Sequence, residues 1–272
     1  MKKIKDYLQK LYDIIITPSM SYLPGNIAFF LVLSIFPILT LIGVIASRFS
    51  ININSLVNII DTALPNDIAI VLDSFVQGKG FDSNIGIFMI IGFFLASNGA
   101  DAIILASNNL YGFPNSSYFK RRIKAIFMII LLILLIIFML GFIAFGNTLL
   151  NFILSYVSNK NLADIIYKLF IILKWPFALF VIFFNTKLIY TIAPDWKIMS
   201  KHTTKGALFT TISWILVVQV YSFWVTHFTN YDLFYGSLSN IVVLMLITYL
   251  ISYILVIGIA INVKSYEYKI ED

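Results

Sequence analysis

Asp101 is the one carboxylate that lies well inside a long apolar segment of this sequence, where a charge is expensive if the segment crosses a membrane. Asn98, Asp101 and Asn108 are three and seven residues apart, so a helix would carry them on one face. Such a face could line a polar pathway or a substrate site, with Lys174 and Asn185 contributed by a facing helix. The alternative is a hydrogen-bonded staple between helices, beside small neighbouring residues.

Lys174 stands directly before Trp175 and Pro176, which places a cation beside a helix-breaking proline. An ion pair with Asp101 would offset the cost of burying both charges. Alternatively, the long side chain of Lys174 extends its ammonium group to the outer interface. The sequence leaves both arrangements open.

Residue types suited to hydrolysis or metal binding are sparse. The chain has two histidines, His202 and His227, and no cysteine, and its glutamates, Glu267 and Glu271, both lie near the C-terminus. A zinc or metallonuclease site needs clustered ligands, commonly three on one face. No serine has a suitable base and acid near it, and no phosphate-binding glycine motif is present. We therefore expect no enzyme activity, no catalytic residue, no metal and no cofactor.

Composition assigns these residues to a membrane protein. The 272 residues are 60% hydrophobic and 12% charged, against about 45–50% and about 25% in soluble domains. This balance excludes a disordered chain, and the absence of cysteine excludes a disulfide scaffold. The net charge of +6 is compatible with nucleic-acid binding, but the positions of the basic residues fit a membrane-topology signal better. We expect no nucleic-acid partner.

Six segments are apolar over about 20 residues, the length that a spanning helix needs. They are residues 26–47, 85–107, 123–146, 165–190, 207–227 and 238–262. The predicted fold is therefore an all-α membrane protein with six transmembrane helices in a single polytopic domain. Basic residues concentrate before the first segment, after the second and fourth, and in the tail, whereas the other loops hold only Arg48, Lys79 and Lys160. This asymmetry predicts that both chain ends lie in the cytoplasm.

Two further segments are amphipathic but cannot span. Residues 1–20 place Ile4, Leu8 and Leu11 at helical spacing, which predicts a helix on the inner leaflet or one packed against the bundle. Residues 50–84 predict two short extracytoplasmic helices with a break at Pro65. These helices would lie on the outer surface, cap the bundle or dip back into it.

An aromatic-rich turn precedes the last predicted span. Tyr231 and Tyr235 stand there with Gly236, which would permit the turn. Tyrosine favours the membrane interface simply as an anchor. The other interpretation is an outer gate, or a contact with a lipid headgroup, over the mouth of the bundle.

Short motifs follow one another in order along nearly the whole chain. They are Ala28-Phe29-Phe30 with Ser34-Ile35-Phe36-Pro37, Ser97-Asn98-Gly99-Ala100-Asp101 with Asn108-Asn109-Leu110-Tyr111, Tyr190-Thr191-Ile192-Ala193-Pro194, Lys205-Gly206-Ala207 with Trp214, and Phe228-Thr229-Asn230-Tyr231 with Tyr235-Gly236-Ser237-Leu238, Gly258 and Asn262. Each motif is weak by itself, but the ordered set resembles the YihY/BrkB family of bacterial inner-membrane proteins. The resemblance implies six spanning helices with both ends in the cytoplasm.

The resemblance brings no settled activity. The family long carried the label ribonuclease BN, and other members are linked to serum resistance and to envelope lipid export. We expect a transporter or flippase-like protein for a lipid or envelope-related substrate, with membrane lipids as its partners. The alternative is a non-transporting scaffold for envelope proteins, and a ribonuclease is the least favoured function. The sequence specifies neither the substrate nor the oligomeric state.

Overall fold

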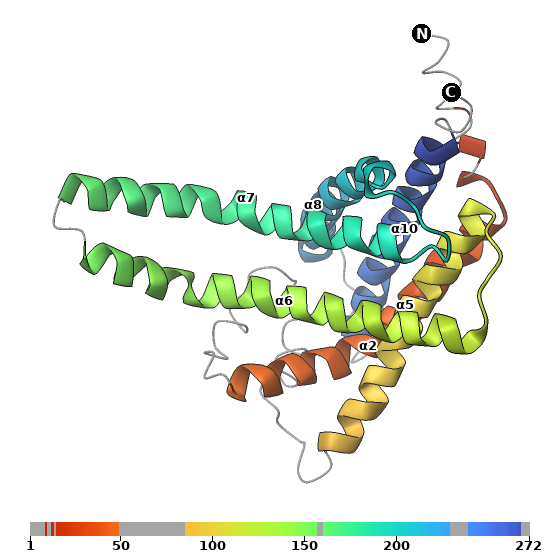
Figure 1. The fold of residues 1–272 in the computed structure, drawn as a ribbon, viewed down its shortest axis with the longest axis horizontal. Helices are drawn as coiled ribbons and strands as arrows, with labels where there is room; N and C mark the ends of the chain where they lie inside the picture. The colour runs from red at the N-terminus through yellow and green to blue at the C-terminus, as the bar shows by residue number, and fades with distance from the viewer. Residues whose placement is uncertain are drawn as a thin grey trace.

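The computed structural model describes residues 15–48, 85–156, 160–228 and 239–267, together with Gln9, Tyr12 and Asp13. In this part of the chain every regular element is a helix (Figure 1). The elements are α2 (Ser19–Arg48), α5 (Ile85–Tyr111), α6 (Tyr118–Ser155), α7 (Lys160–Ile192), the 3-10 helix η1 (Ser200–His202), α8 (Thr204–Phe228) and α10 (Ser239–Glu267). The predicted all-α fold is confirmed to this extent.

Each of the six predicted spans corresponds to one long helix. Within the described residues, two stretches are long and apolar enough to cross a membrane, Thr204–Val225 in α8 and Ile241–Tyr266 in α10. Shorter apolar stretches occupy Ser19–Ser34 in α2 and Pro176–Ile192 in α7. Six membrane spans stay a prediction. The segment 50–84, the turn at Tyr231, Tyr235 and Gly236, and most of residues 1–20 lie outside the described residues.

Helices α6 and α7 extend further than the sequence predicted. They contain 38 and 33 residues, which at 1.5 Å per residue makes them about 57 and about 50 Å long. The hydrocarbon core of a bilayer is only about 30 Å thick. The expected loop between residues 146 and 165 is instead mostly helical, because residues 147–155 hold neither proline nor glycine to break the helix. Figure 1 shows these two helices side by side, projecting away from the other elements.

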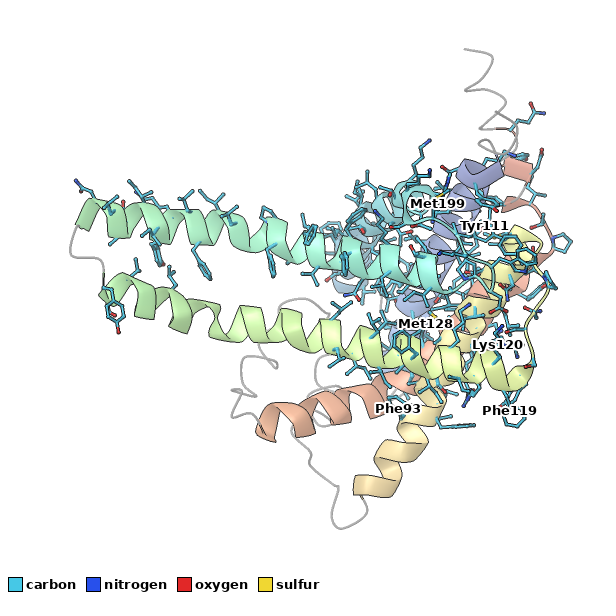
Figure 2. All side chains as sticks on the ribbon, in the orientation of Figure 1. Phe93, Tyr111, Phe119, Lys120, Met128 and Met199 are labelled. Carbon is cyan, nitrogen blue, oxygen red and sulfur yellow. The ribbon has the colours of Figure 1, made fainter. Side chains whose placement is uncertain are left out.

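The long helices pack mainly against two neighbours each, in the order α2, α5, α6, α7, α8 and α10, with α10 against α2. The main core gathers residues from all six of these helices, including Ile27, Ile104, Met128, Tyr190, Ala207 and Val256. A smaller core joins α8 to α10. Figure 2 shows side chains concentrated where the helices converge, around the labelled Met128 and Tyr111.

Two glycines allow α8 and α10 to touch backbone to backbone. A Cβ atom on Gly206 would lie 2.1 Å from the carbonyl oxygen of Gly258, and one on Gly258 would lie 2.1 Å from Thr210 Oγ1. The Gly206 amide donates to Asn262 Oδ1 at 2.8 Å, and the Tyr190 hydroxyl of α7 lies 2.6 Å from Thr210 Oγ1. Small residues with polar bonds beside them are the usual means of close helix packing in membranes. This crossing fixes α7, α8 and α10 relative to one another.

Candidate functional site

The three polar residues predicted to share a face of α5 all contact charged groups. Asp101 Oδ1 accepts a hydrogen bond from Arg121 Nε at 2.5 Å, and Asn98 Oδ1 accepts one from Arg122 Nη1. Asn108 is fully buried and bonds to Asp195. The polar face of α5 is therefore directed at the start of α6 and at the connection between α7 and α8.

Gly112 ends α5 and returns the chain toward Asn108. Its φ of 69° is left-handed, a conformation in which glycine has no side chain to strain. The Phe113 amide donates to the Asn108 carbonyl at 2.9 Å and the Gly112 amide to the Asn109 carbonyl at 3.2 Å, which is the Schellman pattern of a helix end. The turn brings Asn115, whose Oδ1 accepts from Asn108 Nδ2 at 2.9 Å, back against the end of the helix.

Asp195 is the centre of the polar contacts beyond α7. Its Oδ2 atom accepts from Asn108 Nδ2 at 2.7 Å and from the Ser116 amide at 2.9 Å, while its Oδ1 atom accepts from Lys124 Nζ at 2.9 Å. The Asp195 amide in turn donates to Asn108 Oδ1 at 2.8 Å. We call these four residues, Asn108, Ser116, Lys124 and Asp195, the Asp195 latch. The latch ties α5, the α5–α6 turn and α6 to the end of α7.

All three hydrogens of the Lys124 ammonium group have acceptors. Besides Asp195, its ammonium group donates to the carbonyl oxygens of Ala193 at 2.8 Å and Pro194 at 2.7 Å. An ammonium has three hydrogens to donate, and each has an acceptor here. These carbonyls follow directly on α7, where the negative end of the helix dipole favours a cation. Lys124 therefore closes the end of α7 as well as neutralising Asp195.

The Asp195 carboxyl stays ionised at neutral pH. Its burial by itself raises the pKa, but the hydrogen bonds from the Ser116 amide, Lys124 and Asn108 outweigh this, so that the pKa falls from 3.8 to about 2. A carboxylate held in this way accepts hydrogen bonds and does not exchange protons at physiological pH. The latch is thus suited to holding helix ends together and not to carrying protons.

The other two predicted pathway residues lie on α7. The side chain of Lys174 is outside the described residues, and the partner that the structure shows for Asp101 is Arg121. Asn185 has a buried Oδ1 atom that, among the described residues, accepts no hydrogen bond. The structure therefore brings together Asn98, Asp101 and Asn108 with residues of α6 and of the α7–α8 connection. Among the described side chains, it does not join Asn185 to them.

Sequence reasoning missed the partners of the α5 residues. Arg121, Arg122 and Lys124 stand in one basic run after the second predicted span, where the charge pattern indicates membrane topology but does not identify side-chain partners. No pattern in the sequence assigned a role to Asp195. Its position directly after Ala193-Pro194, opposite a basic run across the bundle, is the signal that could have identified it.

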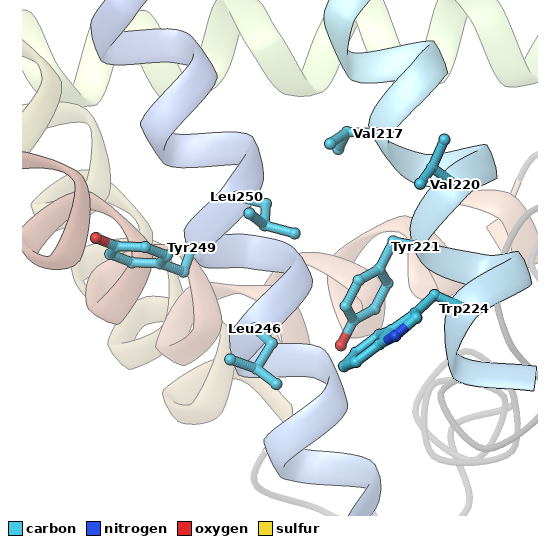
Figure 3. Close-up of a pocket in the computed structure, with 7 residues that line it drawn as sticks. All are labelled: Val217, Val220, Tyr221, Trp224, Leu246, Tyr249 and Leu250. Carbon is cyan, nitrogen blue, oxygen red and sulfur yellow. The ribbon is translucent and has the colours of Figure 1, made fainter. Parts of the chain in front are cut away.

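An apolar groove lies on the surface between α8 and α10, with a volume of about 410 Å³ (Figure 3). It is lined by Val217, Val220, Tyr221 and Trp224 of α8 and by Leu246, Tyr249 and Leu250 of α10. The Tyr221 hydroxyl donates a hydrogen bond to the carbonyl oxygen of Val243 at 2.8 Å, so the polar end of this side chain is already bonded within the protein. All the lining residues lie within the two stretches that are long and apolar enough to cross a membrane.

Groups of three or more histidines, aspartates or glutamates that could hold a metal ion do not occur among the described residues. Two features of the described residues stand out as candidate sites: the Asp195 latch with its neighbouring ion pair, and the apolar groove.

Comparison with known proteins gives consistent relationships. The family described as virulence factor BrkB matches residues 17–271. The chain is 27% identical to a ribonuclease-like protein, YfkH, of Bacillus subtilis (strain 168), and the similar region covers 90% of both chains. It is 28% identical to a UPF0761 membrane protein of Vibrio campbellii (strain ATCC BAA-1116), over 86% of this chain and 74% of that one. No solved structure matches the chain. The family match over nearly the whole length, with the apolar helices α8 and α10, shows that this chain is a membrane protein of the virulence factor BrkB family.

Proposed function

We propose that the protein moves a lipid, or an envelope component carried on a lipid, across the bacterial cytoplasmic membrane. In this proposal six helices span the membrane and both chain ends lie in the cytoplasm. The observation that carries it is the apolar groove between α8 and α10, whose lining lies within the two stretches that are long and apolar enough to cross a membrane.

The size and chemistry of the groove suit an acyl chain. Its volume of about 410 Å³ is in the range of about 300–1,000 Å³ that ligand sites occupy. Side chains of valine, leucine and aromatic type line it, whereas a carrier of polar solutes needs convergent polar groups. Since lipid tails are as apolar as the groove, a chain would be held there by packing against fixed side chains and not by escape from water. The Trp224 and Tyr221 rings, 6.0 Å apart, supply such a rigid wall.

The Asp195 latch supports a route along the side of the bundle. By the positive-inside prediction the latch lies at the cytoplasmic end, where it closes the ends of α5, α6 and α7 against one another. The predicted polar route past Asn98, Asp101 and Asn108 toward Lys174 and Asn185 stays a proposal. It requires the three α5 side chains to exchange the partners that they have in the structure.

A non-transporting scaffold is the second candidate function. The observation that favours it is that Asn98, Asp101 and Asn108 have partners from α6 and the α7–α8 connection, as they would in a closed bundle. We further infer that the protein is not an enzyme. Nuclease activity is supported by names alone, the ribonuclease-like name of the Bacillus relative and the older label of the family, and the sequence offers no cluster of metal ligands for it.

A flipping assay tests the proposal. Purified protein is reconstituted into liposomes that contain a fluorescent phospholipid, and dithionite then bleaches the label in the outer leaflet. Val220→Trp, which fills the groove, is compared with Leu216→Trp, a substitution on the same helix at a residue that is 59% exposed and outside the groove. We expect protein-dependent flipping in the wild type and in Leu216→Trp, and its loss in Val220→Trp. Equal rates in empty liposomes and in wild-type proteoliposomes would favour the scaffold.

A further inference from the structure

Arg122 is a buried cation with no carboxylate partner among the described residues. It is 8% exposed, whereas its neighbours Arg121 and Lys124 form ion pairs with Asp101 and Asp195. A charge buried in a membrane bundle is costly and is ordinarily matched by an opposite charge. The cluster at the start of α6 therefore has one buried positive charge that the described residues do not neutralise.

The Arg122 guanidinium is oriented but not saturated. Nη1 donates to Asn98 Oδ1, Nη2 donates to the Phe94 carbonyl at 3.0 Å, and the Phe94 ring lies 3.8 Å from Cζ. Of five N–H donors, these bonds use two, and the buried Nε atom has no partner. Because an amide, a carbonyl and an aromatic ring hold the guanidinium in place without supplying a negative charge, Arg122 is a preorganised fork. Such a fork matches the oxygens of a phosphate group.

The surroundings of Arg122 also favour an anion. Arg122 stands near the beginning of α6, where the helix dipole is positive and the first turn holds no acidic residue. Lys120, which is exposed, adds a second cation two residues earlier. Figure 2 shows Lys120 and Phe119 at this end of α6.

An exposed apolar stripe on α6 starts beside this cation. The stripe has intervals of three or four residues, the spacing of one helix face, and consists of Phe119, Ile123, Phe127, Ile130 and Leu134. A molecule with a phosphate group at one end and an acyl chain at the other would match both features. We infer that Arg122 binds the phosphate group of an anionic phospholipid whose acyl chain lies along the exposed stripe of α6.

This phosphate site is separate from the groove. It is built by α5 and α6, whereas α8 and α10 form the groove. Lipid binding at Arg122 is therefore measurable in a protein that does not transport, and the failure of one proposal leaves the other standing.

Binding is tested with the whole purified protein. Native mass spectrometry in detergent measures the affinity for phosphatidylglycerol and for phosphatidylcholine, and inorganic phosphate is the water-soluble probe. We expect Arg122→Gln to weaken phosphatidylglycerol binding by about 10- to 100-fold, because it removes charge-assisted hydrogen bonds. The matched control Lys120→Gln removes the same charge at an exposed position, and we expect a loss of about fivefold or less. Arg122→Lys keeps the charge without the fork, so its affinity should lie between those of Arg122→Gln and the wild type.

Thermal unfolding in nanodiscs separates binding from a purely structural role. We expect phosphatidylglycerol to raise the unfolding temperature of the wild type and of Lys120→Gln over that in phosphatidylcholine, and to have no such effect on Arg122→Gln. Equal phosphatidylglycerol affinities for Arg122→Lys and the wild type would overturn the inference. The inference would also be overturned if Arg122→Gln were less stable than the wild type by the same amount in phosphatidylglycerol and in phosphatidylcholine, because that result indicates a purely structural role for Arg122. Binding of inorganic phosphate without binding of phosphatidylglycerol would overturn the assignment to a lipid.

Discussion

Asp195→Asn tests the latch because it removes the negative charge and keeps nearly the same shape. The variant amide can still accept hydrogen bonds through one oxygen, but it cannot neutralise Lys124 or accept from all three donors of the latch. Lys124 would keep its two carbonyl acceptors, Ala193 and Pro194, without a counter-charge. We therefore expect the ends of α5, α6 and α7 to hold together less firmly.

The pKa of Asp195 gives the size of the effect. A carboxyl with a pKa of about 2 in place of 3.8 contributes about 2.5 kcal/mol of stability at neutral pH, at 1.36 kcal/mol per pH unit. Hydrogen bonds to charged groups, about 1.5–3 kcal/mol each, give a similar magnitude. Because the pKa is lower in the folded protein, this stability is fully present above pH 3.8 and is lost as the pH falls through about 2. The difference between the wild type and Asp195→Asn should therefore shrink over that interval.

Thermal unfolding in mild detergent measures the effect. At about 2–4 °C per kcal/mol, we expect Asp195→Asn to lower the midpoint by about 5–10 °C at pH 7. The matched control is Asp164→Asn, which breaks the i,i+4 pair with Lys168, whose side chain is 68% exposed. Such surface pairs contribute little, so the control should move the midpoint by less than about 2 °C. Equal midpoints for Asp195→Asn and Asp164→Asn at pH 7 would refute the latch as a stabilising element.

The same thermal assay tests the contacts between α8 and α10. Gly258→Ala should destabilise the protein by about 1–3 kcal/mol or more, because its Cβ would lie 2.1 Å from Thr210 Oγ1. The control Gly25→Ala, whose Cβ would have nothing within 4 Å, should be neutral or stabilising. A larger loss of stability in Gly25→Ala than in Gly258→Ala would contradict the close crossing of α8 and α10. Trp214→Phe removes the 2.9 Å bond from Nε1 to the Ile251 carbonyl and should cost about 0.5–1.5 kcal/mol, and an unchanged midpoint would show that this bond adds no stability.

The long helices were predictable from apolar length alone. In a bilayer the backbone has no water to bond, so a long apolar segment has to satisfy its own amides and carbonyls as a helix. Helix ends were less predictable. Helix α6 continues to Ser155 and α7 starts at Lys160, in a region where the apolar pattern weakens. Apolar length does not predict these ends, because helix propensity and packing against a neighbouring helix can extend a helix past its apolar segment.

The candidate site was predictable only in part. Helical spacing identified Asn98, Asp101 and Asn108 as one face, but periodicity does not show what lies opposite that face. Asn108 and Asp195 are 87 residues apart in the sequence, and their contact depends on how α5, α6 and α7 converge. Composition and spacing likewise could not locate the groove, because it arises from the relative positions of side chains on two helices.

Lipid analysis of the gently extracted, purified protein tests directly whether the groove between α8 and α10 binds a lipid. Mass spectrometry compares the lipids that co-purify with the wild type, with Val220→Trp, with an unrelated six-helix protein and with the bulk membrane. We expect a lipid or polyprenyl-phosphate species to be enriched on the wild type, and this enrichment to be lost in Val220→Trp but kept in Arg122→Gln, which should lose only the phosphatidylglycerol bound at α6. A wild-type lipid profile equal to those of the bulk membrane and the unrelated protein would contradict lipid binding in the groove.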